Sequence, residues 1–242
     1  MGFVADMKIL YHMLLKPVKG DDHAQRMESF YGDQAEGYDD FRRRLLKGRE
    51  KLWQNLPKDE GCVWVDMGGG TGANIENFES DISKPKSIYV VDLSGSLLQV
   101  AANRFEKKGW HNVKTVEADA TKFSPPEGLA DVVTFSYSLT MIPDWFAAIE
   151  NAKAILKPGG LIGVVDFYVS RKFPTSPLKQ HKWFTRNFWP TWFATDNVFP
   201  NADHLPFLKH HFETEFLEEN ANRLPYVPLI KAPYYVFVGR KR

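Results

Sequence analysis

The spacing of apolar residues changes once along the chain, near residue 63. Up to Trp53, apolar side chains recur every three to four positions, beginning within residues 7–14. This spacing places them on one face of a helix, so residues 1–56 are predicted to form a helical N-terminal cap. Pro57 ends the helical pattern, because proline is poorly tolerated inside a helix.

From residue 63 onward, short β-rich runs alternate with helical runs. The strand candidates are residues 63–67, 88–92, 113–117, 131–136 and 161–167. The helical runs between them are residues 73–78, 96–108 and 145–156. A Lys-Pro-Gly-Gly sequence at 157–160 marks the end of the last helical run. Alternation of this kind implies right-handed crossovers and a parallel sheet.

The last quarter of the chain departs from this alternation. Residues 169–212 are rich in aromatic residues and proline, and they are predicted to form an irregular insertion. Two β-patterned runs follow, 214–222 and 233–240, joined by the proline-rich residues 224–232. Their simplest arrangement is an antiparallel pair at the edge of the parallel sheet. The predicted fold is therefore α/β, a doubly wound, mostly parallel seven-stranded sheet in a single domain over residues 1–242.

Composition limits the kinds of function that this fold can serve. The 31 Lys and Arg residues against 30 Asp and Glu leave a net charge of +1, which is too balanced for a nucleic-acid-binding surface over the whole protein. The longest apolar stretches fall well short of the roughly 20 residues that a spanning helix needs, and no secretory signal peptide is recognisable. Cys62 is the single cysteine, which rules out an internal disulfide and a cysteine-rich zinc site and favours a cytoplasmic protein.

The strongest chemical signal is a glycine-rich turn directly after the first predicted strand, Asp66-Met-Gly-Gly-Gly-Thr-Gly72. Glycines at this place let the backbone turn tightly and approach a ligand where any Cβ would collide. The turn also fits dinucleotide binding, but the NAD fingerprint is Gly-x-Gly-x-x-Gly, whereas Gly68, Gly70 and Gly72 alternate. NAD is therefore the less favoured cofactor.

Two further strand ends carry carboxylates that suit a nucleoside. The second predicted strand ends in Asp92, where an acid can accept hydrogen bonds from both ribose hydroxyls. The third is followed by Asp119, where an acid can accept a hydrogen bond from the exocyclic amine of an adenine. The alternative for either residue is a solvated carboxylate at a strand end.

Together these features resemble the class I S-adenosylmethionine-dependent methyltransferases. The resemblance implies S-adenosylmethionine as the cofactor, with the alternating glycines against its methionine part. The residues that it implies for cofactor binding are Tyr38, Asp66, Gly68, Gly70, Gly72, Asp92, Leu93, Asp119, Ala120 and Ser136. Leu93 would lie against the adenine and Ala120 would help to read its edge. Tyr38 belongs to a Tyr-Asp pair that often covers the cofactor as a lid in this superfamily.

The same resemblance assigns roles around the methyl group. Asp66 is expected to support the glycine turn and the ammonium of the cofactor rather than to perform chemistry. Ser136 and Tyr137, at the end of the fourth predicted strand, would border the transferred methyl group.

The insertion contains an unusual concentration of rings. Within residues 183–199, seven of seventeen residues are aromatic, and basic residues such as Lys182 and Arg186 are interleaved with them. Core packing accounts for such a run, but rings with basic neighbours also suit a lipid interface. We expect Trp189 and Trp192, together with the N-terminal amphipathic helix, to bind a membrane surface peripherally.

A closer resemblance covers nearly the whole chain. Five segments carry it: HAQRMESFY (23–31), YDDFR (38–42), TFSYSLTMIPDW (134–145), GVVDFYVSR (163–171) and FWPTWF (188–193). They are similar to the methyltransferase component of betaine-lipid synthases, which methylates the amine of diacylglyceryl-homoserine three times to give diacylglyceryl-trimethylhomoserine. Some members are fused to an aminocarboxypropyl transferase that also uses S-adenosylmethionine. No such domain is present here, so the sequence is either a stand-alone enzyme or a domain excised from a fused synthase.

Methyl transfer to a neutral amine asks little of the protein beyond alignment of nitrogen, methyl and sulfur. The amine must be unprotonated, and the candidates to assist are Tyr137, Asp166, His181 and His204. Aromatic faces stabilise the growing quaternary ammonium, and Tyr31, Tyr38, Tyr137 and Tyr168 are candidates. Arg42 and Arg171 are candidates to hold the homoserine carboxylate.

Two alternatives to a betaine-lipid N-methyltransferase remain open. One is a methyltransferase of another acceptor, such as phosphatidylethanolamine or a quinone precursor. The other is a non-catalytic module that binds S-adenosylmethionine, which the intact glycine turn and the two strand-end acids make less favoured. The expected partners are the lipid substrate and a membrane surface, with no nucleic acid. The expected location is the cytoplasm at a membrane, which in a eukaryote would be the cytosolic face of the endoplasmic reticulum.

Overall fold

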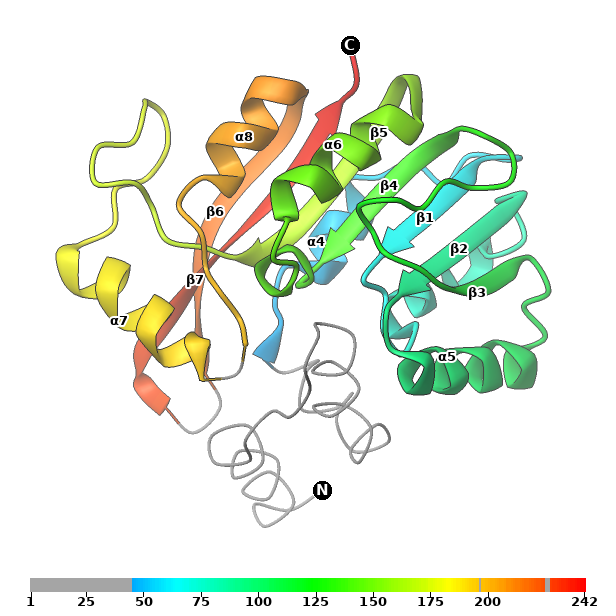
Figure 1. The fold of residues 1–242 in the computed structure, drawn as a ribbon, viewed down its shortest axis with the longest axis horizontal. Coiled ribbons are helices and arrows are strands. Elements are labelled where there is room, and N and C mark those ends of the chain that lie inside the picture. Colours follow the sequence, from blue (N-terminus) through cyan, green and yellow to red (C-terminus); the bar gives the residue numbers. More distant parts are fainter. Residues whose placement is uncertain (1–44, 196, 225–226) are drawn as a thin grey trace.

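The structure is a computed structural model that describes residues 45–195, 197–224 and 227–242. Within these residues seven strands form one sheet: β1 (Val63–Met67), β2 (Ser87–Asp92), β3 (Val113–Glu117), β4 (Ala130–Ser136), β5 (Leu156–Phe167), β6 (Glu213–Leu224) and β7 (Val227–Arg240). Their order is β3-β2-β1-β4-β5-β7-β6 (Figure 1). Neighbouring strands from β3 to β5 are parallel, and β7 pairs antiparallel with both β5 and β6. The predicted doubly wound, mostly parallel sheet is therefore confirmed.

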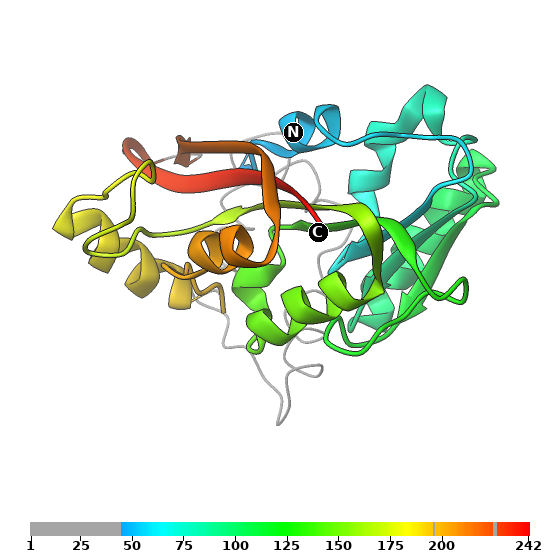
Figure 2. The same cartoon turned by 90° about the horizontal axis from the view of Figure 1, so that it is seen from above.

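Helices cover both faces of this sheet. The described helices are α4 (Arg49–Gln54), α5 (Gly95–Lys108), α6 (Trp145–Ile155), α7 (Trp183–Ala194) and α8 (His204–His211), with the 3-10 helices η1 (Ala73–Asp81) and η2 (Leu139–Met141). Side chains of α4, η1, α5 and α7 join one hydrophobic cluster, and those of α6 and α8 join the other. Figure 2 shows α4 on one side of the sheet and α6 and α8 on the opposite side.

The central strands are buried on both faces, as parallel strands between two helical layers are. Every residue of β1 is buried, and its side chains alternate between the two clusters. Trp64 stacks on Trp53 of α4 with ring centroids 4.7 Å apart, and the edge of Phe78 meets both rings. This aromatic contact fixes α4 against the strand that carries the glycine turn.

The C-terminal pair is longer than the sequence predicts. The structure extends the two strands to Leu224 and Val227, so most of the proline-rich stretch 224–232 is strand rather than linker. Proline lacks only the backbone donor, and its carbonyl can still pair: Pro233 accepts a hydrogen bond from the Tyr168 amide at 3.2 Å. Likewise β5 begins at Leu156, earlier than the predicted start at residue 161.

The insertion 169–212 is not irregular throughout, because it contains α7 and α8. Trp189 is only 2% exposed, and its ring stacks on Phe193, which in turn stacks on Phe167 of β5. Trp192 is partly buried against the same cluster. The expectation that Trp189 lies at a lipid interface is therefore wrong, and core packing accounts for this half of α7.

Most of the predicted N-terminal cap lies outside the described residues, including Tyr38, Arg42 and the amphipathic helix. Its described part contains α4, where Leu52 and Trp53 are buried. No helix in the described ranges has both the length and the apolar character needed to cross a bilayer.

Candidate active site

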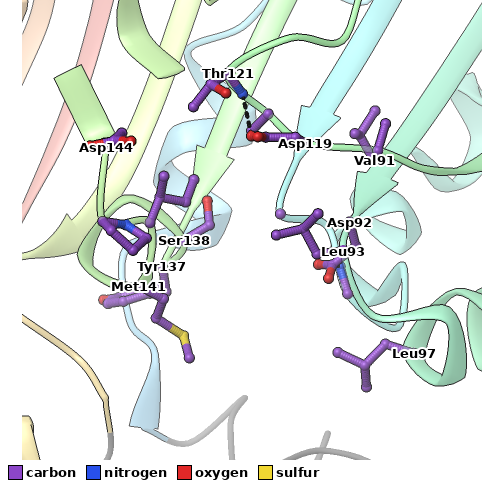
Figure 3. A pocket seen from close by; sticks show the side chains of 16 residues that line it. Val91, Asp92, Leu93, Leu97, Asp119, Thr121, Tyr137, Ser138, Met141 and Asp144 are labelled. Carbon is purple, nitrogen blue, oxygen red and sulfur yellow. Dashed lines mark hydrogen bonds between the residues drawn. The ribbon is translucent and has the colours of Figure 1, made fainter. Parts of the chain in front are cut away.

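A pocket of about 230 Å³ opens at the carboxyl ends of the parallel strands (Figure 3). It is lined by Gly68, Gly70, Val91, Asp92, Leu93, Leu97, Ala118, Asp119, Ala120, Thr121, Tyr137, Ser138, Met141, Ile142, Pro143 and Asp144. These residues follow β1, β2, β3 and β4. Between β1 and β4 the strand order reverses direction, which is where ligands bind in open α/β sheets.

The glycine turn lies between the two walls of the pocket, of which one carries Asp92 and Asp119 and the other follows β4. Gly68, Gly70 and Gly72 all have positive φ angles, of 68°, 55° and 68°. A Cβ on Gly68 would lie 2.4 Å from the Ser138 Cβ, and one on Gly72 would lie 2.3 Å from the Phe105 ring. Glycine is required here both for its backbone conformation and for close approach.

Asp92 ties the glycine turn to the helix that follows β2. Its Oδ2 accepts a hydrogen bond from the Gly70 amide at 2.9 Å, and its Oδ1 accepts one from the Ser94 amide at 3.0 Å. Ser94 in turn caps α5 by accepting a hydrogen bond from the Leu97 amide. The two amides fix the Asp92 carboxylate at the wall of the pocket that it lines.

Asp119 lies on the same side of the pocket as Asp92. Its Oδ1 accepts a hydrogen bond from the Thr121 amide at 2.8 Å, which fixes the carboxylate at the end of the turn after β3. Figure 3 shows Leu93 and Leu97 below it. Acids and aliphatic side chains on one wall provide both hydrogen-bond acceptors and an apolar surface for a flat base.

The facing wall comes from β4 and the segment after it. Tyr137 has a φ of 56°, a strained conformation for a non-glycine residue, and its amide donates to the Val165 carbonyl. Its hydroxyl donates to the Lys47 carbonyl at 2.6 Å, and the Arg49 guanidinium lies 5.6 Å from the ring centroid. Burial raises the pKa of this hydroxyl well above its usual range. The Tyr137 hydroxyl is thus engaged as a hydrogen-bond donor to the backbone.

Asp66 and Ser136 lie behind the glycine turn rather than in the pocket wall. Asp66 is completely buried and accepts hydrogen bonds from Thr134 Oγ1 at 2.7 Å and Asn74 Nδ2 at 3.3 Å. Burial raises the pKa of Asp66 to about 6, and the hydrogen bonds and the charge of Arg49 oppose that rise. The geometry agrees with the expected supporting role of Asp66 for the turn.

The structure does not bring Asp166 to the pocket. Its carboxylate is fully buried, with Oδ1 accepting from Thr140 Oγ1 at 2.7 Å and from the Phe167 amide at 2.8 Å, and Oδ2 from the Thr140 amide at 3.1 Å. Burial raises the pKa of Asp166 to about 7. These bonds hold Thr140 of η2, whose Met141 lines the pocket, while Asp166 itself is not among the lining residues.

His181 also lies apart from the pocket. Its Nδ1 accepts a hydrogen bond from the Ser170 amide at 3.1 Å, its ring meets the edge of Tyr168, and burial lowers its pKa. His204 is buried beside Trp145, and burial lowers its pKa to about 3. The predicted catalytic group of Tyr137, Asp166 and His181 is therefore not assembled: only Tyr137 lines the pocket, because the other two point into packed regions.

Sequence reasoning missed Arg49. With Gly68, Gly69, Thr71, Ala73, Asn74 and Ser136 it lines a second hollow. The two hollows share Gly68, so they meet at the glycine turn. Arg49 Nε donates to Ser136 Oγ at 3.0 Å across 87 positions of sequence. Nothing in the spacing of the N-terminal residues identifies this arginine; only the fold of α4 against β1 and β4 does.

The residues present fit a nucleoside with a charged amino-acid tail. Two carboxylates and an apolar wall face the main pocket, the turn excludes any Cβ beside Ser138, and a cation lies at the second hollow. That donor and acceptor set matches S-adenosylmethionine from its adenine to its carboxylate.

Comparison with known proteins gives the family. The family model described as "Methyltransferase domain" matches residues 37–220, so the chain belongs to this family of class I S-adenosylmethionine-dependent methyltransferases. It is 27% identical over 190 residues to the ubiquinone/menaquinone biosynthesis C-methyltransferase UbiE of Pseudomonas fluorescens, covering 76% of this chain and 73% of that one.

Solved structures share the fold. A SAM-dependent methyltransferase from Aquifex aeolicus matches with a TM-score of 0.60 at 14% identity, covering 88% of this chain and 99% of that one. The N-methyltransferase NodS from Bradyrhizobium japonicum matches with a TM-score of 0.58 at 15% identity, covering 84% and 97%. The protein is an enzyme, and its cofactor is S-adenosylmethionine.

Proposed function

We propose that this methyltransferase transfers methyl groups to the amine of diacylglyceryl-homoserine, three times, to give diacylglyceryl-trimethylhomoserine. One observation supports the proposal: the segment 134–145, whose sequence resembles betaine-lipid synthases, builds the pocket wall opposite Asp92 and Asp119. Six residues of that segment line the pocket, namely Tyr137, Ser138, Met141, Ile142, Pro143 and Asp144. The resemblance thus includes a pocket wall that the shared cofactor turn does not form.

The cofactor is held by residues of both hollows. Asp92 accepts hydrogen bonds from the ribose hydroxyls, and Asp119 with Ala120 reads the adenine edge while Leu93 lies against the base. At the other end, Arg49 pairs with the carboxylate of the methionine part. The cofactor, when bound, supplies a methyl group on a positively charged sulfur.

The acceptor side needs positioning and a route for the proton of the amine. Each transfer forms a carbon–nitrogen bond as the carbon–sulfur bond breaks, and the sulfur leaves as the neutral thioether of S-adenosylhomocysteine. The amine must therefore be neutral when it is presented in line, and the proton that it loses before each transfer passes to solvent water at the exposed edge of the pocket. Asp144 lies exposed at the pocket rim beside Pro143 and supplies negative charge that attracts a cationic head group. Tyr137 contributes its fixed position next to the methyl group, since its hydroxyl is engaged with the Lys47 carbonyl.

The role of Arg49 predicts a selective loss of affinity. Arg49→Met is expected to weaken binding of S-adenosylmethionine by roughly 1.5–3 kcal/mol, because the carboxylate loses a charge-assisted hydrogen bond. Binding of 5′-methylthioadenosine, which lacks the amino-acid tail, should be nearly unchanged. Calorimetry with both ligands measures the difference, and equal losses for the two would show that Arg49 acts on the fold of the pocket instead.

The acceptor is tested by incubating the enzyme with labelled S-adenosylmethionine and a panel of lipids and quinone precursors, with products read by mass. We expect mono-, di- and trimethylated diacylglyceryl-homoserine. Removing the homoserine carboxylate should cost more activity than shortening an acyl chain, because the carboxylate orients the amine. Detection of an O- or C-methylated product without any N-methylated lipid would overturn the proposal.

The similarity to UbiE favours a second candidate, C-methylation of a quinone precursor. That reaction attaches the methyl group to carbon and needs no amine. The lipid panel separates the two candidates, since a methylated quinone precursor with no methylated lipid amine would establish the second.

A further inference from the structure

One end of the long axis of the molecule is formed by α7 and the segment that leads into it, as both views show (Figures 1 and 2). Within the described residues, six large apolar side chains are exposed, and three of them lie in this region. Phe173 is 77% exposed, Trp183 is 71% and Phe184 is 53%. We call Phe173, Trp183 and Phe184, together with Lys172 and Lys182, the aromatic tip.

The rings of the aromatic tip are carried by one hydrogen-bonded neck. The Ser170 amide donates to His181 Nδ1 at 3.1 Å, and the His181 amide donates to Ser170 Oγ at 2.8 Å. Gln180 Nε2 donates to the Lys172 carbonyl at 2.7 Å. Phe173 therefore follows one of the two hydrogen-bonded segments, and Trp183 follows the other.

The aromatic tip is attached to the rest of the protein through buried side chains of α7. The second half of α7 is fixed by Trp189 and Phe193, whose rings are buried. Phe184 stacks on Phe188 with ring centroids 5.0 Å apart, which connects the exposed turn to the anchored part. Trp183 and Phe184 are thus presented to solvent by the first turn of α7, whereas Phe173 lies in the segment before it.

The charge of this region has one sign. Residues 171–195 contain five Lys and Arg residues and no Asp or Glu. One of the five is paired with an acid, since Arg171 Nε lies 2.6 Å from Asp203 Oδ1. The Lys179 ammonium instead donates a hydrogen bond to the Glu219 backbone carbonyl. Lys172 and Lys182, the two next to the exposed rings, form no ion pair with the described part of the chain.

We propose that the aromatic tip docks this enzyme on an anionic lipid bilayer. Exposed rings beside lysines that form no ion pair with the described residues match an interface in which apolar groups lie at the depth of the head groups and phosphates face the cations. Lys172 already lies over the Phe173 ring, with Nζ 5.2 Å from its centroid. Half of the large apolar side chains that the described residues expose belong to this one end of the protein, which marks it as an interaction surface. The proposal does not depend on which acceptor is methylated, so it goes beyond the proposed function.

The tip is connected to the pocket through packed rings. Tyr137 of the pocket wall meets Phe167 with ring centroids 4.7 Å apart, and Phe167 stacks on Phe193 at 4.6 Å. From Phe193 to Trp183, α7 rises about 15 Å at about 1.5 Å per residue. Docking by the tip would therefore hold the wall of the pocket at a set distance from the bilayer.

Vesicle co-sedimentation tests the apolar part. The variant Phe173→Ser/Trp183→Ser/Phe184→Ser is compared with a matched variant that removes exposed apolar groups elsewhere, Leu129→Ser/Phe146→Ser, on vesicles of phosphatidylcholine with phosphatidylglycerol. The tip variant should partition at least about ten-fold less, because burial of ring area no longer contributes, and the matched variant less than about two-fold. Equal partitioning of the tip variant and the unmodified protein, or equal losses in both variants, would overturn the proposal.

Vesicle composition tests the charged part. Lys172→Gln/Lys182→Gln should lose the gain in binding that phosphatidylglycerol gives at low salt, whereas Lys107→Gln/Lys209→Gln should keep it. S-adenosylmethionine affinity of all variants should match that of the unmodified protein, because none of these residues lines the pocket. Their unfolding temperatures should fall only slightly, because the substituted rings and aliphatic side chains are exposed even where, as for Phe184, they touch a neighbouring ring. A tip variant that changes from dimer to monomer on size exclusion while binding vesicles normally would show a protein interface instead of a lipid one. The lipid-panel assay in detergent is independent of this result, so failure of docking and failure of the proposed function are distinguishable.

Discussion

Trp189→Ala is expected to lower the free energy of unfolding by about 3–5 kcal/mol. Its ring is almost completely buried between Phe188 and Phe193, and removing it leaves a cavity that these rings cannot fill. Denaturant unfolding at equilibrium, with the slope checked for two-state behaviour, gives the value.

The control is Trp183→Ala, in the first turn of the same helix. Trp183 is exposed, so its removal should change the free energy of unfolding by no more than about 0.5 kcal/mol. The opposite ranking, with Trp189 dispensable for stability and Trp183 essential, would mean that α7 packs with its other face inward.

Asp92→Ala should weaken S-adenosylmethionine binding by roughly 1–3 kcal/mol, which is about 5- to 150-fold in dissociation constant. The ribose loses a charged acceptor, and the amides of Gly70 and Ser94 lose their partner at the same time. Isothermal titration calorimetry measures the change. Unchanged affinity would overturn the placement of the ribose.

Two further variants serve as comparisons for Asp92→Ala. Asp119→Ala should also weaken binding, with a larger loss of discrimination against adenine analogues altered at the exocyclic amine. Glu117→Gln changes an exposed acid at the end of β3 that does not line the pocket, and it should leave affinity unchanged. An equal loss for every adenine analogue in Asp119→Ala would argue against base reading.

The cofactor turn could be predicted because its signals are local. Alternating glycines directly after an apolar strand, and an acid at the end of each of the next two strands, depend only on neighbouring residues. The parallel sheet then brings Gly68, Asp92 and Asp119 to one edge without further information. Local β-patterning also predicted the C-terminal antiparallel pair, but it did not predict the length of the two strands.

Contacts between distant segments could not be predicted. The sequence FWPTWF does not reveal which ring of α7 faces β5, so Trp189 was expected at a lipid surface. Asp166 lies near the carboxyl end of β5, a common place for a catalytic acid, but Thr140, 26 positions away, donates a hydrogen bond to its carboxylate. Arg49 and Ser136 meet only because α4 packs beside β4.

We infer that the hollows on either side of Gly68 bind one S-adenosyl ligand. An experimental structure of the protein with S-adenosylhomocysteine tests this inference most directly. We expect ribose hydroxyls within hydrogen-bond distance of Asp92, the adenine between Leu93 and Asp119, and the carboxylate at Arg49. A ligand bound in the reverse direction, or outside the pocket lined by Asp92 and Tyr137, would contradict it.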